Sequence, residues 1–273
     1  MQFIDRELAH RLEMSEAIPQ VHFAAELKRH SKDLNPAYEQ IAGSHCVFIH
    51  PGCVVGRCVG LGLAGSVTAA DLDQIEEFYR SRGEAAQIDV CPQADMSLLE
   101  LMKERPYRLE ELNDVLVRPI SATEEFDGQP AQAEIRRVHN AEAREVCAVV
   151  ARAFLEGKDP DPKFVEIFLP LYLAESCFAF AAYVDGKIVG GAAGMVIPEA
   201  RIATMFGAAT LPEYRGRGIQ SAFLRERLKL SQTAGAEYAV IVTRACTASQ
   251  RNSMRAGFTL AYSKPVMKRT FMT

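Results

Sequence analysis

The sequence lacks long hydrophobic runs: no stretch approaches the roughly 20 apolar residues that a membrane-spanning helix needs. The N-terminal stretch MQFIDRELAHRLEMSEA mixes charged and apolar residues and has no signal-peptide core. The 7 cysteines are an odd number scattered along the chain, which favours free thiols in a reducing compartment. These features predict a cytoplasmic protein that has no membrane partner.

The sequence also lacks an excess of one charge sign. It has 31 lysines and arginines against 35 aspartates and glutamates, which gives a formal net charge of −4. This balance provides no general attraction to nucleic acid, so we expect no nucleic-acid partner. With 48% hydrophobic and 24% charged residues over 273 positions, the composition is typical of a globular chain long enough for two domains. Any anion-binding site must therefore be built locally.

Familiar phosphate-binding motifs are missing or poorly placed. No G-x-x-x-x-G-K-[ST] string occurs. The stretch GLGLAG at 60–65 matches G-x-G-x-x-G, but the next helix is capped by Thr68, whereas a dinucleotide fingerprint opens its helix within the glycine run. We interpret Gly60, Gly62 and Gly65 as part of a small-residue strand, and a nicotinamide-dependent oxidoreductase as the alternative that these glycines leave open.

A group of histidines and cysteines lies close together in the sequence without a metal-ligand spacing. It consists of His45, Cys46, His50, Cys53 and Cys58. The spacing C-x₆-C-x₄-C fits no common zinc pattern, and alternate strand positions would scatter the ligands over both faces of a sheet. We therefore predict buried free cysteines and no metal site.

Residues 121–133, SATEEFDGQPAQA, are polar, contain Gly and Pro, and have no apolar period, which is typical of a linker. On each side of them the pattern indicates a strand pair, a capped helix, a strand, a short helix and a last strand. We predict an α+β (mixed α/β) fold with one domain at 1–120 and a second at 134–273, each a mixed, largely antiparallel sheet flanked by helices.

The stretch LPEYRGRGIQ, residues 211–220, is the strongest chemical signal. It follows an apolar strand and precedes a helical pattern that begins near Ile219. A helix N-terminus offers free backbone N–H groups and a favourable dipole to an anion. Gly216 and Gly218 allow a ligand to approach the backbone, and Arg215 and Arg217 add charged donors. This combination predicts a phosphate-binding turn, with a basic helix-capping turn as the alternative.

This stretch resembles the signature of the GNAT superfamily, the acetyl-CoA-dependent N-acetyltransferases, whose fingerprint is [RQ]-x-x-G-x-[GA]. Arg215, Gly218 and Gln220 stand at the three fixed positions, and Gln220 departs from the family's Gly or Ala. The later stretch NSMRAGF resembles the family's helix that ends in a Gly-Phe pair. The resemblance covers about residues 133–270.

The resemblance implies that coenzyme A enters between the strand MFGAATL and the strand YAVIVTRAC. Residues near the acetyl and pantetheine portions would be Ala208, Ala209, Thr210 and Asn252, and the backbone N–H near Ala208 would stabilise the oxyanion. The amides around the pyrophosphate would be those of Arg215, Gly216, Arg217, Gly218, Ile219, Gln220 and Ser221.

The general acid is poorly defined. Many family members carry a tyrosine four residues before the glycine of the Gly-Phe pair, where this sequence has Ser253. Tyr262 is a substitute of the right chemistry in the last strands. No carboxylate stands out as the base.

The sequence therefore predicts transfer of an acetyl group from acetyl-CoA to an amine acceptor, a small molecule or a peptide, by direct transfer and without a metal. Because Ser253 and Gln220 depart from the family pattern, a non-catalytic acyl-CoA-binding or sensor protein is the alternative. The first half has no counterpart of YRGRGIQ. We interpret it as a degenerate GNAT-like or accessory domain, since double-domain members of the superfamily exist.

Overall fold

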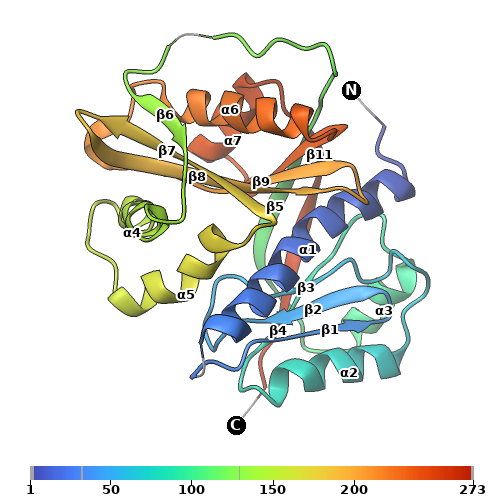
Figure 1. The fold of residues 1–273 in the computed structure, drawn as a ribbon. Coiled ribbons are helices and arrows are strands. Elements are labelled where there is room, and N and C mark those ends of the chain that lie inside the picture. The colour runs from blue at the N-terminus through green and yellow to red at the C-terminus, as the bar shows by residue number, and fades with distance from the viewer. Residues whose placement is uncertain (1–2, 32, 129, 272–273) are drawn as a thin grey trace. The chain divides into compact units, whose positions relative to one another are not determined.

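The computed structural model describes residues 3–31, 33–128 and 130–271 (Figure 1). The chain forms two compact units. Unit 1 runs to Leu116 and adds Val242–Thr247 and the residues from Thr259 onward, and unit 2 comprises Val117–Ile241 and Ala248–Phe258. This division differs from the predicted domains, because the last strand clusters with unit 1.

Unit 1 is a mixed sheet with three helices. Its elements are α1 (Arg6–His30), β1 (Ala37–Ile41), β2 (Ser44–Phe48), β3 (Cys58–Val59), α2 (Ala69–Arg80), β4 (Ala86–Asp89), α3 (Met96–Lys103), most of β5 (Arg108–Pro119) and β11 (Thr259–Arg269). The strand order is β1-β2-β3-β4-β11-β5. The β1–β2, β2–β3 and β4–β11 pairs are antiparallel, and β3–β4 is parallel.

Helix α2 begins where the sequence predicts. The Thr68 side chain accepts from the Asp71 N–H, and the Asp71 carboxylate accepts from the Thr68 N–H, which confirms the capping box. Leu72, Ile75 and Phe78 face the core that this helix shares with the sheet.

The glycines at 60–65 form a turn, so the prediction of a small-residue strand there is wrong. Strand β3 ends at Val59, and Gly60, Gly62 and Gly65 all have positive φ, which a β-strand does not allow. A Cβ on Gly60 would lie 2.7 Å from the Met14 Cε of α1. Helix α2 starts only at Ala69, so the helix N-terminus of a dinucleotide site is not formed at this turn.

The cysteines near this turn are free thiols. Cys46 and Cys58 face each other across the β2–β3 pair, and both are fully buried. The hydrogen bond with Cys58, and then burial, raise the pKa of the Cys46 thiol. Among the described residues, no group of His, Cys, Asp or Glu side chains has the arrangement of a metal site. None of the described helices combines the length and apolarity needed to span a membrane.

Unit 2 contains the other strands of the same mixed sheet, with helices on both faces (Figure 1). Its elements are β6 (Glu134–Arg137), α4 (Ala143–Phe154), α5 (Pro162–Leu173), β7 (Cys177–Val184), β8 (Lys187–Ile197), β9 (Ile202–Thr210), α6 (Ile219–Thr233), the first part of β10 (Tyr238–Arg244) and α7 (Ala248–Arg255). The order is β10-β9-β8-β7-β6, in which only β9–β10 is parallel. The mixed, largely antiparallel fold predicted for each half is confirmed.

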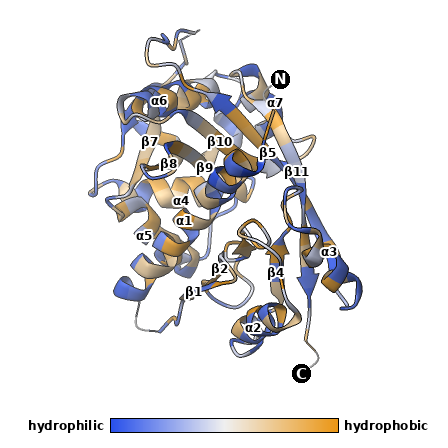
Figure 2. Cartoon of the chain, turned by 90° about the vertical axis from the view of Figure 1, so that its right-hand side faces the viewer, coloured by the Kyte–Doolittle hydropathy of each residue, from blue (hydrophilic) through white to orange (hydrophobic). Residues whose placement is uncertain are grey.

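Strands β7, β8 and β9 are largely hydrophobic because both of their faces are covered (Figure 2). Val146 and Val150 of α4 pack on one face, and Ile219 and Phe223 of α6 pack on the other. A Cβ on Gly191 of β8 would lie 2.8 Å from both valines, so this glycine permits the close approach of α4.

The stretch 121–133 contains no helix or strand among its described residues, but it is packed against unit 2. The Gln232 side chain of α6 donates to the carbonyls of Ser121 and Glu124, at 2.6 and 2.9 Å. Further along, the Gln132 N–H donates to the Arg217 carbonyl at 3.0 Å. The predicted linker is therefore a strap along α6 that reaches the loop 211–218.

Candidate functional site

Strand β9 contains a bulge where the resemblance places the acetyl group. Gly191 pairs with Ala209, but Ala193 pairs with Phe206, so β9 has one more residue than β8 between these pairs. Gly207 lies at this point and has φ +59°. A bulge leaves a residue out of the ladder and redirects its backbone groups. The small residues Gly207 and Ala208 are half-buried there, so a ligand can approach their amides.

Strand β9 separates from β10 just before the bulge. The two parallel strands pair at Ile202, Ala203 and Thr204 of β9, and among the described residues the pairing ends there. Strand β9 continues to Thr210. Its edge from Met205 onward therefore has no β10 partner, and its backbone groups are available to a bound ligand.

The loop after β9 leads into a helix N-terminus without a side-chain cap. A short 3₁₀ turn, Pro212–Tyr214, follows the strand, and Gly218 at φ +77° is the N-cap of α6. Within the described part of the chain, no side chain caps the first N–H groups of this helix. They remain available to an anion, together with the positive end of the helix dipole. The local backbone thus fits the predicted pyrophosphate site at 216–221. The predicted contact from the Arg215 N–H does not fit, because this N–H donates to the Pro212 carbonyl at 3.2 Å and closes the 3₁₀ turn.

The Arg215 side chain is held by protein groups. Its guanidinium donates to the Thr210 carbonyl at 3.2 Å, to the Ala153 carbonyl at 3.2 Å, and to both carboxylate oxygens of Glu156 at 2.8 and 3.2 Å. This hydrogen bonding lowers the pKa of Glu156. Arg215 therefore anchors the loop to the end of α4. Arg217 stacks at 5.0 Å over the Tyr214 ring.

Gln220, which departs from the family signature, bonds to the end of β9. Its Nε2 donates to the Thr210 Oγ1 at 3.0 Å. The longer side chain thus links the first turn of α6 to the strand that the loop leaves. The amides of Ile219, Gln220 and Ser221 belong to the same first turn.

Asn252 and Ser253 lie on α7 of unit 2. The Asn252 side-chain amide is half-buried and makes no hydrogen bond to any described residue, so it is available to a ligand. Ser253 is buried, and its Oγ donates to the Ser249 carbonyl at 2.9 Å. A hydroxyl with this partner is a poor acid for a thiolate.

Tyr262 lies on β11 of unit 1. Its hydroxyl donates to the Glu13 Oε1 at 2.8 Å. Burial and the nearby carboxylate of Glu13 raise the pKa of Tyr262 well above its usual value. These contacts explain the conformation of Tyr262 within unit 1 and argue against its role as the acid.

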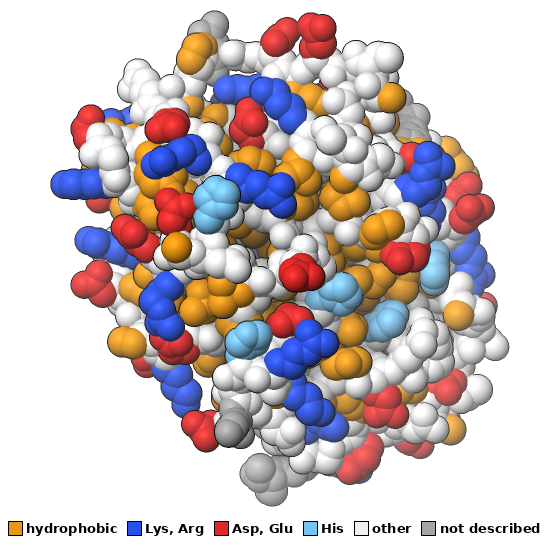
Figure 3. Space-filling model, viewed as in Figure 1, with side chains coloured by type: hydrophobic (Ala, Val, Ile, Leu, Met, Phe, Trp, Pro, Cys, Tyr) orange, Lys and Arg blue, Asp and Glu red, His pale blue; other side chains and the backbone are white. Residues whose placement is uncertain are grey.

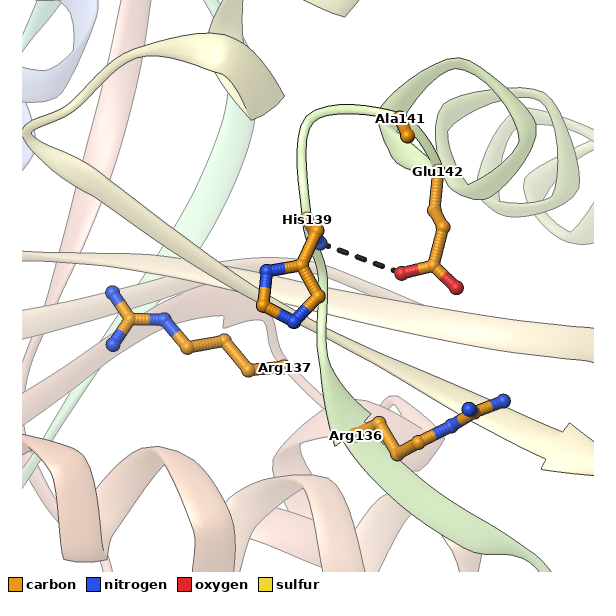
Figure 4. A pocket seen from close by; sticks show the side chains of 5 residues that line it. All are labelled: Arg136, Arg137, His139, Ala141 and Glu142. Atoms are coloured by element: carbon orange, nitrogen blue, oxygen red, sulfur yellow. Dashed lines mark hydrogen bonds between the residues drawn. The ribbon is translucent and has the colours of Figure 1, made fainter.

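A pocket of about 550 Å³ lies at the junction of β6 and α4 in unit 2 (Figure 4). Arg136, Arg137, His139 and Glu142 line it together with Ala141. The Tyr183 hydroxyl donates to Glu142 at 2.6 Å, which lowers the pKa of Glu142. Strands β7 and β8 separate β6 from β9 in the sheet, so this pocket is not part of the loop and bulge.

Sequence reasoning missed the strap residues beside the loop. A Cβ on Gly218 would lie 3.5 Å from the Ala131 Cα. Pro130, Ala131 and Gln132 therefore border the predicted pyrophosphate site. Their position could not be predicted from the sequence, because a polar stretch with Gly and Pro has the same linker pattern whether or not it packs against a binding site.

Unit 1 repeats the connection but not the site. β3–α2–β4 is a parallel strand pair joined by a helix, as is β9–α6–β10. In unit 1 the Arg6 guanidinium of α1 donates to the carbonyls of Gly62 and Leu63, at 2.9 and 3.2 Å. The turn before α2 is thus bonded to the chain's own helix, and Thr68 caps α2.

Comparison with known family models finds a match that lies largely within unit 2. The model of the acetyltransferase (GNAT) family matches residues 143–258, from the start of α4 to the turn after α7. The match therefore identifies residues 143–258 as similar to a GNAT-family acetyltransferase domain. The sequence matches no curated protein.

Solved structures share the fold along most of the chain. A GCN5-related N-acetyltransferase from Kribbella flavida has a TM-score of 0.63 and 15% identity, with 94% of this chain and 96% of that chain covered. A tandem GNAT protein from the clavulanic acid biosynthesis pathway has a TM-score of 0.57 and 12% identity, with 82% and 77% covered. A functionally unknown conserved protein from Staphylococcus epidermidis has a TM-score of 0.57 and 13% identity, with 90% and 97% covered. At these identities the similarity concerns the fold.

Proposed function

We propose that this protein is an N-acetyltransferase that moves the acetyl group of acetyl-CoA directly to an amine on a small molecule or a peptide. One observation carries the proposal: the bulged, unpaired edge of β9 continues into the uncapped N-terminus of α6. The edge suits an extended pantetheine arm, and the helix N-terminus suits a pyrophosphate. The GNAT-family match over the same elements supports this assignment.

The residues of unit 2 have distinct roles in this proposal. The amides from Gly216 to Ser221 bind the pyrophosphate, since the Arg215 N–H is donated to the Pro212 carbonyl. The backbone at Ala209 and Thr210 and the Asn252 amide hold the pantetheine. The Ala208 N–H donates to the thioester oxygen and stabilises the negative charge that develops there when the amine attacks. Water or the acceptor itself takes the proton from the attacking amine and returns a proton to the leaving thiolate of coenzyme A. Ser253 and Tyr262 do not serve here, since each hydroxyl donates its hydrogen bond elsewhere.

The surface charge is consistent with a small acceptor. On the face shown in Figure 3, acidic and basic side chains are interspersed and form no extended basic patch. Such a surface gives little support to a polyanionic partner.

A thiol-release assay tests whether the protein is an enzyme. The full chain is incubated with acetyl-CoA and a panel of primary amines and N-terminal peptides, and free coenzyme A is measured with a thiol reagent. We expect at least one amine to raise thiol release above the rate with acetyl-CoA alone. Binding of acetyl-CoA without release for any amine would instead favour the alternative, a non-catalytic acyl-CoA-binding or sensor protein, which the departures at Ser253 and Gln220 permit.

A further inference from the structure

Arg227 is a buried cation that no acidic side chain neutralises. It lies on α6 and is 2% exposed. Its Nε donates to the Phe223 carbonyl and its Nη1 to the Ala193 carbonyl, both at 3.2 Å. Among the described residues it forms no ion pair. Burial lowers the pKa of Arg227 to about 9, so the guanidinium is still charged at neutral pH.

Such a residue is unfavourable for folding alone. A buried charge without a counter-ion loses its hydration and gains only weak compensation from neutral carbonyls. Neighbouring core positions of α6 hold Phe223, Leu224 and Leu228, so an apolar side chain would fit the general pattern of this helix. The exception at Arg227 therefore calls for a reason other than packing.

The Ala193 carbonyl that Arg227 bonds belongs to the strand opposite the β9 bulge. Ala193 pairs with Phe206, the residue just before Gly207, and the register shifts between Ala193 and Gly191. A bulge disrupts the ladder on the partner strand as well as on its own. Arg227 supplies a donor to this stretch of β8 from the helix side. Because the Ala193 carbonyl of β8 already has a donor in Arg227, it does not need a hydrogen bond from the β9 amides beyond Phe206. Those amides are then free to face a ligand.

We propose that Arg227 is a positioning residue for the acetyl site: by bonding the Ala193 carbonyl it holds the bulge so that the Ala208 N–H faces the thioester oxygen. This inference rests on the proposed function. It also assigns a use to the positive charge, which bonds β8, the strand next to the β9 bulge that is proposed to face the oxygen that becomes negative during transfer. A fixed charge in a dry interior acts more strongly there than it would in water.

The test uses the full-length chain and the carbonyl stretch of acetyl-CoA, read by infrared difference spectroscopy with ¹³C-labelled acetyl groups. When acetyl-CoA binds to the wild type, a hydrogen bond from the Ala208 N–H should lower the stretching frequency of the acetyl carbonyl. In Arg227→Met we expect about half or more of the shift to be lost, while the Kd for acetyl-CoA stays within about threefold. For an amine that is acetylated, we expect kcat to fall by about 10- to 100-fold with little change in KM.

Ser231→Ala is the matched control. Ser231 is buried on the same helix, and its Oγ bonds the Arg227 carbonyl, so the variant perturbs α6 without touching Ala193. We expect it to retain the full infrared shift. Because Arg227→Met also removes an unpaired buried charge, its Tm should equal or exceed that of the wild type.

The outcomes distinguish a failure of the role proposed for Arg227 from a failure of the proposed acetyltransferase function. A folded Arg227→Met that keeps the whole shift overturns the inference alone. Parallel losses of Tm and of acetyl-CoA affinity would show a merely structural role and would also overturn it. If Arg227→Met fails to fold, Arg227→Lys decides, since it keeps the charge but loses the planar donor geometry and should show a reduced shift. A wild type that does not bind acetyl-CoA overturns the proposed function and this inference with it.

Discussion

The guanidinium of Arg215 joins its own loop to the end of β9 and to the end of α4. It bonds Thr210 at the end of β9, and Ala153 and Glu156 at the end of α4. The ion pair with Glu156 is exposed, with 47% and 69% of the two side chains accessible, so it contributes little by itself. The two bonds to backbone carbonyls fix the loop more firmly, because their acceptors do not move. At this scale Arg215 acts as an anchor of the loop rather than as a ligand of the phosphate.

The anchor role predicts unequal effects at the two ends of the ion pair. Arg215→Ala should weaken acetyl-CoA binding by about 3- to 10-fold, since the loop must be ordered on binding. Glu156→Gln should change the Kd by less than about twofold, because Arg215 keeps its two carbonyls. Isothermal titration of both variants checks this. A several-fold gain in affinity for Glu156→Gln would show that a freed Arg215 binds the phosphate itself.

A substitution at Tyr262 distinguishes a role in stability from a role in catalysis. Tyr262→Phe removes one hydrogen bond to the buried Glu13, which is worth about 1 kcal/mol. For a chain of this size the Tm should fall by about 2–4 °C. Acetyl transfer should be unchanged, as it should in Ser253→Ala. If Tyr262→Phe instead loses most of its transfer rate at an unchanged Tm, the tyrosine is the general acid.

Helix α1 and strand β11 are joined by a buried ionic cluster within unit 1. Lys264 is fully buried and bonds Glu13, Glu16 and Asp89 at 2.6–3.0 Å. Burial lowers the pKa of Lys264, but the three carboxylates raise it by more, so the amine stays charged. Burial raises the pKa of Glu13, and it raises that of Glu16 to about 7. Arg57, 3.5 Å from Asp89, is the other cation facing this cluster.

This cluster predicts a stability that falls as the pH rises. Glu16 holds its proton in the folded state up to about pH 7 but loses it near pH 4.5 when unfolded. The folded chain therefore binds more protons between these values, and the free energy of unfolding decreases across this window by at most about 3 kcal/mol. Glu13 acts in the same direction. Calorimetry should show a Tm that declines from pH 5 to pH 8, and a smaller decline in Glu16→Gln. Equal declines in both proteins would contradict the assignment.

Elements with local signals could be predicted from the sequence, and those with distant causes could not. Thr68 and Asp71 define the start of α2, and the Asp-Gly pair at 185–186, a common hairpin signal, forms the turn between β7 and β8 with φ of 49° and 75°. By contrast, Glu13 and Glu16 are ordinary helix residues in the sequence, because their partner Lys264 lies about 250 residues away. The bulge at Gly207 was also invisible, since it is a mismatch between two strands. The phosphate turn was found because its glycines and arginines are contiguous.

The strand–helix–strand connection of unit 2 recurs in unit 1, but among the described residues the features of the candidate cofactor site occur together in unit 2. The strand order and the parallel pair of unit 1 match the order of elements predicted for both halves. In unit 1, however, Arg6 bonds the turn and Thr68 caps the helix at the place where a second phosphate would bind. Assignment of β11 to unit 1 could not be predicted, because its pairing with β4, Val266 opposite Asp89, joins distant parts of the chain. Composition shows where a chain is polar, but long-range strand pairing decides which unit a strand joins.

The most direct test of the account is the stoichiometry of acetyl-CoA binding to the full-length chain, measured by isothermal titration. Gly218→Asp and Gly235→Asp form a matched pair, because both glycines flank α6 with φ near +77° and each gives up the same backbone freedom. The aspartate at 218 would put its carboxylate on the helix N-terminus, while the one at 235 lies at the other end of α6. We predict one site per chain in the wild type and in Gly235→Asp, and no binding in folded Gly218→Asp. Two sites per chain, or a Gly218→Asp variant that binds like the wild type, would contradict the account.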